Sequence, residues 1–433
     1  MHLPPFQWLS QSSERAETCN LFPQKNLQAT SAVGIQDMIC QQENPTMAHA
    51  ATTELHTRPE RPRVLVAEDQ EDVIAALRLL LKSSGYEAEF VNSPAEAINA
   101  LQRHPFDAIL LDLNYSRDTT SGTEGLELIS AVLALDSTMA VVVMTAWGSI
   151  ELAVDAMHRG ACDFVQKPWD NRQLLNVLEQ QMKRSQELRL KKLSEQLEQQ
   201  EAAQVQRALM PHEIAPRDGM TVVASSQSAR TVGGDYYDVI ELGALRSALC
   251  IADVVGKGMG AALLMSNLQA AVRMLASDVI EPKPFCERVN KAVSGNNVPG
   301  KFITFFYCVV DSGEKRISYT NAGHNWPILA HADGSLQRLT SDDVVLGTMR
   351  EWSYHQQQAE LRSGDRLVLF TDGITECADA DGQEFSEEKL VELVSQNVLL
   401  SASDLKDLIL AQANEHCKSA FTDDATLIVV AVH

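Results

Sequence analysis

The sequence has no run of about 18 apolar residues, and its first residues lack the basic and apolar regions of a signal peptide. Its eight cysteines include no CxxC pair, so neither a zinc site nor a disulfide framework is indicated. Basic residues are few: 36 against 58 acidic ones, a formal net charge of -22 that disfavours nucleic acid and anionic membranes as partners. We therefore expect a cytoplasmic protein with no nucleic-acid or membrane partner.

Changes in composition divide the 433 residues, which are too many for one typical hydrophobic core. Residues 1–60 are rich in Gln, Ser, Thr, Pro and Glu, and we expect a disordered tail in which Met47 is an alternative start of translation to Met1. Residues 61–180 alternate five short apolar strands with five amphipathic helices. This alternation predicts an α/β domain with a doubly wound, five-stranded parallel sheet.

The rest of the chain has a different texture. Residues 181–212 are charged and Gln-rich, with apolar residues at roughly helical spacing, and they predict a helical linker. Its imperfect heptads leave open a coiled coil that forms a homodimer and a solvated monomeric helix. Residues 213–433 show strands in hairpin succession with segregated helices. This pattern predicts an α+β domain built as an antiparallel β-sandwich.

Polar side chains follow four strands of the first domain. Glu68 and Asp69 come after the first strand, and later strands are followed by Asp112, Thr145 and Lys167. Because the carboxyl ends of parallel strands meet at one edge of a sheet, these side chains are predicted to share a pocket. Three carboxylates suit Mg²⁺ and an ammonium suits a phosphoryl oxygen, so Asp112 is a candidate nucleophile that forms an acyl phosphate.

The segments "AED", "LLDLN", "MTA" and "FVQKP" resemble the receiver domain of two-component response regulators, over about residues 63–185. The resemblance implies phosphorelay signalling in which a sensor histidine kinase phosphorylates Asp112. It also implies that Thr145 and Lys167 contact the phosphoryl group, that Phe164 is the switch aromatic, and that Lys167-Pro168 is a cis peptide. The implied Mg²⁺ ligands are Glu68, Asp69, Asp112 and the carbonyl of Asn114.

Aspartates also end or interrupt strands at four separate places in the last domain: Asp235, Asp253, Asp372 and Asp423. Asp235 and Asp372 stand beside glycine, and Asp423 beside another aspartate, which favours a shared site. Such short carboxylates suit a two-metal centre that lowers the pKa of a bound water and clamps an in-line displacement at phosphorus. The two glycines before Asp235 indicate a bulge or the close approach of a backbone or ligand.

The segments "VGGDYYDV", "ADVVGKGMGAALLM", "FITFFYCVVD", "NAGHNWP", "LFTDGITEC" and "DDATLIVV" resemble metal-dependent serine/threonine protein phosphatases of the bacterial sporulation-stage-II-E type, over about residues 205–433. The resemblance implies two Mn²⁺ or Mg²⁺ ions and a phosphorylated protein substrate, an anti-sigma-factor antagonist. It also implies that the glycines let the backbone approach a metal-bound phosphate. The implied metal ligands, and so the catalytic residues, are Asp235, Asp253, which bridges the metals, the carbonyl of Val254, Asp372 and Asp423.

Four further residues of this domain are not counted among the implied metal ligands. Asp238 is interpreted as a hydrogen-bond acceptor behind the ligands, and Asp424 as structural. His324 is either a general acid or, by the more common pattern, a hydrogen-bonding structural residue. Lys257, in a glycine-rich turn, is left out of the site because such turns are weak indicators of phosphate binding.

These observations predict a phosphorylation-regulated phosphatase in which Asp112 controls hydrolysis of phosphoserine or phosphothreonine through the linker helix. The alternative is a non-catalytic response-regulator adaptor that binds a sigma factor or an anti-sigma partner. Degenerate phosphatase domains of that kind tend to lack the metal carboxylates. Since all four aspartates are present here, catalysis is favoured.

Overall fold

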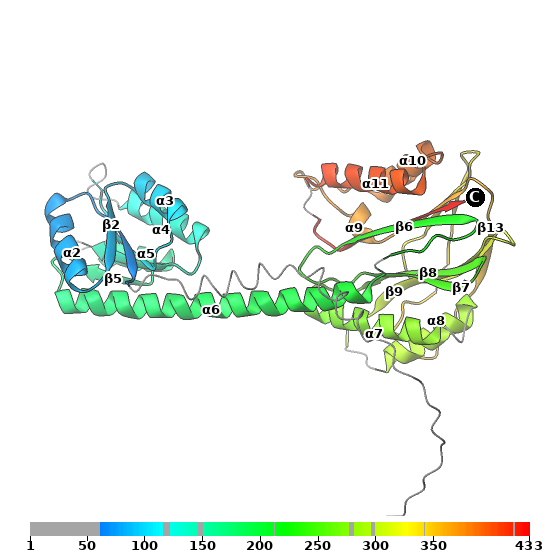
Figure 1. Ribbon diagram of the computed structural model, residues 1–433, viewed down its shortest axis with the longest axis horizontal. Coiled ribbons are helices and arrows are strands. Elements are labelled where there is room, and N and C mark those ends of the chain that lie inside the picture. Colours follow the sequence, from blue (N-terminus) through cyan, green and yellow to red (C-terminus); the bar gives the residue numbers. More distant parts are fainter. Residues whose placement is uncertain are drawn as a thin grey trace, which may run out of the picture. The chain divides into compact units, whose positions relative to one another are not determined.

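The computed structural model describes residues 61–115, 122–145, 150–211, 213–276, 281–295, 299–341, 343–418 and 421–433. The predicted tail and Met47 lie outside this part of the chain. Contacts divide the chain into two compact units, Met1–Gln181 and Met182–His433 (Figure 1). Within the described ranges, no helix combines the length and the apolar character that crossing a membrane requires.

The first unit contains a five-stranded parallel sheet in the order β2-β1-β3-β4-β5, which confirms the predicted doubly wound class. Its β1, β3 and β4 are almost wholly buried, because helices cover both faces of such a sheet. The strands are β1 (Arg63–Ala67), β2 (Glu87–Val91), β3 (Ala108–Asp112), β4 (Ala140–Thr145) and β5 (Asp163–Gln166). The connecting helices are α2 (Glu71–Ser83), α3 (Pro94–Arg103), α4 (Thr123–Leu135) and α5 (Ile150–His158).

A single helix, α6 (Asn171–Leu209), contains most of the predicted linker and begins ten residues earlier. Its first turns bury Leu174 and Leu178 in the first unit. Farther along, Leu190 and Leu197 are 45% and 46% exposed. They stand seven residues apart, which is the spacing of one heptad. The interior of α6 has no glycine or proline to interrupt it.

The second unit is a sandwich of two five-stranded antiparallel sheets, as predicted. One sheet has the order β13-β10-β9-β8-β7 and the other β12-β11-β14-β15-β6. The first sheet contains β7 (Tyr236–Gly243), β8 (Arg246–Val254), β9 (Ile303–Asp311), β10 (Arg316–Ala322) and β13 (Gln357–Glu360). The second contains β6 (Met220–Gln227), β11 (Ile328–Ala330), β12 (Leu336–Arg338), β14 (Arg366–Phe370) and β15 (Ala425–Val432).

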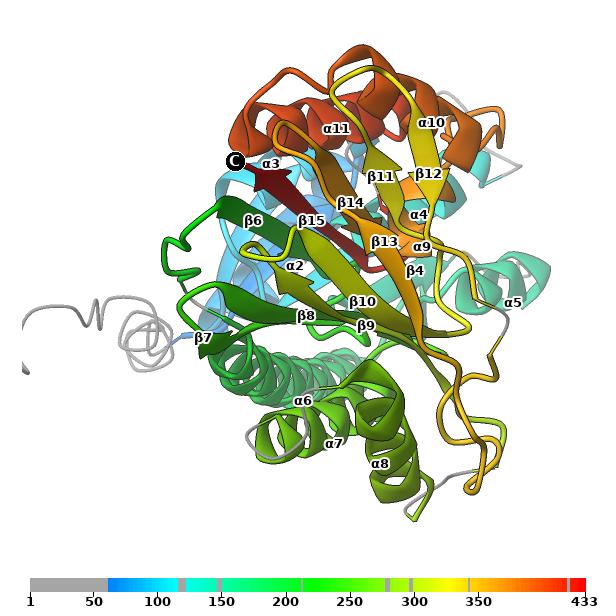
Figure 2. The same cartoon turned by 90° about the vertical axis from the view of Figure 1, so that its right-hand side faces the viewer.

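Helices cover the outer face of each sheet, so both faces of the central strands are buried (Figure 2). On β8, Leu249 and Ile251 face the other sheet, whereas Cys250 and Ala252 face the helices. This period of two is what a strand buried on both sides requires. The helices are α7 (Met259–Leu275) and α8 (Pro282–Ser294) on the first sheet, and α10 (Glu387–Gln396) and α11 (Ala402–His416) on the second.

Candidate metal centres

The carboxyl ends of β1 and β3 bring together the acidic residues predicted for the first domain. Oxygen atoms of Glu68, Asp69 and Asp112 lie within 4.8 Å of one another. Lys167 Nζ lies 2.6 Å from Glu68 Oε2 and 2.8 Å from Asp112 Oδ2. Burial raises the pKa of Glu68, which is fully buried, although the ammonium of Lys167 opposes this effect. The cluster offers the oxygen ligands that suit Mg²⁺.

The other residues predicted for the receiver site lie around this cluster. The backbone N–H of Asn114 donates to Asp112 Oδ1 at 3.3 Å. Thr145 ends β4 and is buried, and its carbonyl accepts from the backbone N–H of Lys167 at 2.7 Å. Phe164 on β5 is 46% exposed, and Lys167-Pro168 is cis, as the resemblance implied. The roles assigned to these side chains stay predictions.

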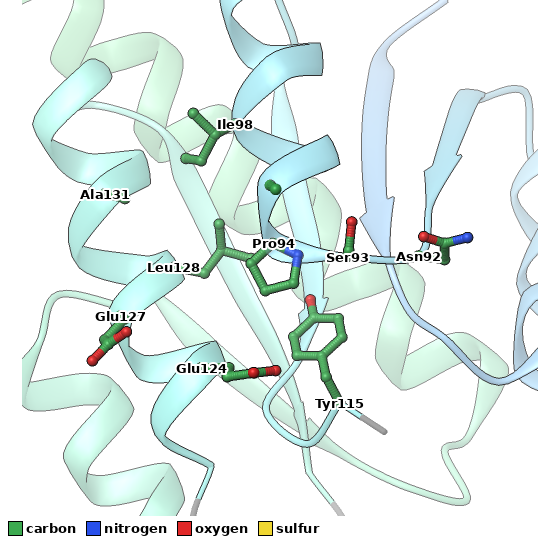
Figure 3. Close-up of a pocket in the computed structure, with 10 residues that line it drawn as sticks. Asn92, Ser93, Pro94, Ile98, Tyr115, Glu124, Glu127, Leu128 and Ala131 are labelled. Carbon is green, nitrogen blue, oxygen red and sulfur yellow. The ribbon is translucent and has the colours of Figure 1, made fainter. Parts of the chain in front are cut away.

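A pocket of about 660 Å³ lies between α3 and α4 in the same unit (Figure 3). Pro94, Ile98 and Leu128 form its apolar lining, and the carboxylate of Glu124 lies near the ring of Tyr115. The Tyr115 hydroxyl donates to the carbonyl of Ala67 at 3.3 Å, directly before the acidic cluster. The sequence patterns gave no sign of this pocket, because its walls come from separate helices.

Four elements of the second unit carry the predicted phosphatase aspartates. Asp235 directly precedes β7, Asp253 lies on β8, Asp372 begins α9 (Asp372–Thr375), and Asp423 precedes β15. Their negative charges act on one another. Burial first, and then Asp372 and Asp423, raise the pKa of Asp253 to about 7. Burial and the charge of Asp253 raise the pKa of Asp235 well above its usual range. The fold therefore gathers all four carboxylates into one electrostatic environment.

The surroundings of Asp235 fit a divalent cation. Its Oδ2 accepts a hydrogen bond from Thr371 Oγ1 at 2.8 Å, whereas its Oδ1 is buried and has no hydrogen-bond partner among the described residues. A buried acceptor without a donor is costly unless a cation or water satisfies it. Carboxylates and a backbone carbonyl are the oxygen ligands that Mg²⁺ and Mn²⁺ prefer. In the described part of the chain, the acidic side chains whose oxygens all lie within 4.8 Å of one another are those of the receiver cluster, and the four phosphatase aspartates do not form such a group.

The structure shows which groups approach the glycines before Asp235. A Cβ on Gly233 would overlap the carboxylate of Asp424, and a Cβ on Gly234 would lie 2.9 Å from the carbonyl oxygen of Val254. These glycines therefore accommodate protein groups, including the backbone whose close approach the sequence predicted, and the approach to a metal-bound phosphate stays a prediction. The contact also places the Val254 carbonyl beside the segment that carries Asp235.

Asp424 and Asp238 both hold structure together, by different contacts. Asp424 accepts from the backbone N–H of Ala229 at 2.8 Å and of Gly234 at 2.5 Å, in line with its predicted structural role. Asp238, interpreted from the sequence as an acceptor behind the ligands, accepts from Tyr236 Oη at 2.7 Å and pairs with Arg273 of α7 at 2.5 Å. Its carboxylate therefore fixes α7 to β7.

His324 has the environment of a structural histidine. It is 4% exposed, and its Nδ1 lies 2.8 Å from Thr304 Oγ1. Its backbone N–H donates to Asn321 Oδ1 at 2.7 Å. Burial lowers the pKa of His324 to about 4, so the ring is neutral near pH 7 and has no extra proton to give. Of the two readings of this residue, the structure favours the structural one.

Lys257 belongs closer to the acidic site than the sequence indicated. Its Nζ lies 2.8 Å from Asp423 Oδ2 and 2.6 Å from the carbonyl oxygen of Thr422. Its charge also acts on Asp253 and Asp372, whose pKa values it lowers against the larger effect of burial. Its position between two glycines, four residues after Asp253, was the available signal.

Comparisons with known proteins agree with this arrangement. Residues 64–179 match the response regulator receiver domain, and residues 244–433 match the family of stage II sporulation protein E (SpoIIE). The chain is 31% identical over 231 residues to the phosphoserine phosphatase RsbU of Bacillus subtilis (strain 168), covering 53% of this chain and 68% of RsbU. The chain therefore belongs to the SpoIIE-type family of metal-dependent protein phosphatases and carries a receiver domain ahead of the phosphatase domain.

Two further comparisons cover about half of this chain. Protein IcfG of Synechocystis sp. is 26% identical over 262 residues, which are 54% of this chain and 41% of IcfG. The chain thus spans less than half of that relative. Among solved structures, the SiaA-PP2C domain of Pseudomonas aeruginosa aligns with a TM-score of 0.49 at 18% identity, covering 56% of this chain and 98% of that one.

Proposed function

We propose that the chain hydrolyses phosphoserine or phosphothreonine on a partner protein in the cytoplasm, and that phosphorylation of Asp112 by a sensor histidine kinase controls this activity. The observation that carries the proposal is the mutual proximity of aspartates from separate elements: Asp235, Asp372 and Asp423 all lie close to Asp253 or act on its charge, and Asp235 Oδ1 has no hydrogen-bond partner among the described residues. Such a carboxylate set is suited to divalent cations and thus to phosphoryl chemistry.

The ligands proposed for Mn²⁺ or Mg²⁺ are Asp235, Asp253, the Val254 carbonyl, Asp372 and Asp423. When bound, these ions would lower the pKa of a water and stabilise charge on the phosphoryl oxygens. Thr371 orients Asp235 through its 2.8 Å hydrogen bond, and Asp424 holds the backbone just before it. Because His324 is buried and neutral, we assign proton donation to the leaving group to water.

Regulation is proposed to start at the receiver cluster, where Asp112 is the phosphoacceptor and Glu68, Asp69 and the Asn114 carbonyl hold Mg²⁺. Lys167 already bridges Glu68 and Asp112, so a phosphoryl group on Asp112 would meet a fixed positive charge. Thr145 is proposed as the second contact of that group. Movement of Phe164 would then report the phosphorylated state.

The substrate that we propose is an anti-sigma-factor antagonist, because the curated relative RsbU is a phosphoserine phosphatase of the same family. We also propose that α6 pairs with a second copy of the chain. The exposure of Leu190 and Leu197, seven residues apart, supports a coiled-coil seam. Light scattering with and without a phosphoryl mimic tests this pairing.

The experiment that tests the function measures Mn²⁺-dependent phosphate release from a phosphoserine protein, with and without a small-molecule phosphodonor. Wild type, Asp372→Asn and Asp112→Asn are compared. We expect wild type to turn over, Asp372→Asn to be inactive, and Asp112→Asn alone to ignore the phosphodonor. If wild type is no faster than Asp372→Asn with either metal, the adaptor alternative replaces the phosphatase.

A further inference from the structure

The last turns of α6 form hydrogen bonds with the segment that carries Asp235. Gln206 Nε2 donates to the carbonyl oxygen of Gly233 at 2.6 Å, and Gln206 Oε1 accepts from the backbone N–H of Gly233 at 3.0 Å. One side-chain amide thus satisfies both backbone groups of one residue. Gln206 is 9% exposed, so neither bond can be replaced readily by water. Nearby, Ala203 of α6 packs with Val232 and Ala262.

The segment bound by Gln206, residues 233–235, is also in close contact with other protein groups between Gln206 and the proposed metal site. On its other sides Gly233 abuts the Asp424 carboxylate, and Gly234 donates to Asp424 Oδ2 at 2.5 Å. Gly234 also lies against the carbonyl of Val254, a proposed metal ligand. Asp235 follows directly in the chain. A shift of α6 relative to this segment would therefore be passed to Asp235, because close-packed groups cannot absorb it locally.

We propose that Gln206 is a positioning residue through which the linker helix sets the place of Asp235 and so the metal affinity of the phosphatase site. The inference rests on the proposed function, since it takes Asp235 as a metal ligand. It assigns the coupling between linker and site to one pair of hydrogen bonds inside the second unit. Phosphorylation that moves α6 would act on metal binding through this pair.

The chain supplies a matched control for this proposal. Gln204 is the same residue type on the same helix two positions away, and it is exposed. Gln206→Ala removes both bonds, Gln206→Glu keeps the acceptor for the Gly233 N–H but removes the donor to its carbonyl, and Gln204→Ala changes only the exposed surface. All are made in the full chain with Asp69→Asn as a common background, so that the receiver cluster is weakened equally in each.

Calorimetric titration with Mn²⁺ is the main readout. We expect Gln206→Ala to weaken Mn²⁺ binding at least about tenfold, as for the loss of a buried bidentate contact. The Mn²⁺ affinity of Gln206→Glu should fall between those of Gln206→Ala and the parent. The Mn²⁺ affinity of Gln204→Ala should match that of the parent. Hydrogen exchange without metal gives a second readout, in which backbone amides of residues 231–236 should exchange faster in Gln206→Ala than in Gln204→Ala.

The outcomes separate the two proposals. If the parent binds Mn²⁺ and Gln206→Ala binds it as tightly, Gln206 is only structural and this inference is wrong, even if the variant is less stable. If Gln206→Ala does not fold, Gln206→Glu decides by the same comparison. If the parent itself binds no Mn²⁺ outside the receiver cluster, the proposed metal site fails, and this inference fails with it.

Discussion

Replacing His324 by glutamine should make the phosphatase unit more resistant to acid while leaving its chemistry intact. The histidine pKa is lowered by burial from 6.5 to about 4, so the unfolded chain binds the proton more tightly than the folded chain. The stability that the neutral ring contributes is therefore present above pH 6.5 and is lost as the pH falls towards 4. At about pH 5 these two pKa values correspond to a loss of about 2 kcal/mol relative to neutral pH.

The assay is urea unfolding followed by pulsed hydrogen exchange and mass spectrometry on peptides from residues 303–322, which report the second unit by itself. Wild type should lose about 2 kcal/mol more than His324→Gln between about pH 7.5 and pH 5. His433→Gln, which alters an exposed histidine, is the control and should behave as wild type. Equal acid sensitivity of wild type and His324→Gln would refute the buried neutral ring.

The same variant tests the general-acid alternative. If His324 only holds Thr304 and its own loop, His324→Gln should keep Mn²⁺-dependent hydrolysis within a few-fold of wild type at neutral pH. A general acid contributes about 10²- to 10⁴-fold. A loss of hydrolytic rate of that size, in a variant that binds Mn²⁺ normally, would show that His324 is a catalytic residue.

Three further changes have expected outcomes. Lys257→Met should tighten Mn²⁺ binding by about tenfold in calorimetry, because the Lys257 ammonium, which pairs with Asp423, repels a cation. Weaker Mn²⁺ binding in this variant would mean that Lys257 mainly orders the Asp423 carboxylate. Gly233→Ala should lower the free energy of unfolding in urea by about 2 kcal/mol or more, because the added Cβ would overlap Asp424. Gly260→Ala, in the open first turn of α7, is the control and should leave that free energy unchanged or raise it. The rise in melting temperature caused by Mn²⁺ should be larger at about pH 8 than at about pH 6, because the pKa of Asp253 is about 7 without metal and a proton must leave first; a pH-independent rise would contradict this.

Strand patterns were sufficient to predict both folds and the main carboxylates. Asp112 and Asp253 stand at or near the ends of strands whose apolar runs are unambiguous, and sheet geometry then fixes where such residues gather. The apolar run of β8 was sufficient to predict a strand there, whereas its place between β9 and β7 in the sheet comes from the structure. Strand formation is a property that a few neighbouring residues determine.

Contacts between distant segments could not be predicted in this way. Lys257 meets Asp423 across 166 residues of chain, and Gln206 meets Gly233 across 27 residues that include strand β6. The glycines before Asp235 could be recognised as a point of close approach, but not what approaches them. The partner of Asp238, Arg273 on α7, could not be predicted because 35 residues separate the two.

The pairing of β15 with β6 has a consequence for synthesis of the protein. The first strand of the sandwich is bonded to the last one, and Asp423 and Asp424 directly precede that last strand. In a nascent chain, the proposed ligand Asp423 and the Asp424 contact to Gly234 are therefore not held in place until residues 425–432 have left the ribosome and paired with β6. We expect a product shortened by this one strand to keep its receiver domain but to lose Mn²⁺-dependent hydrolysis, because Asp423 and Asp424 would no longer be held by β15.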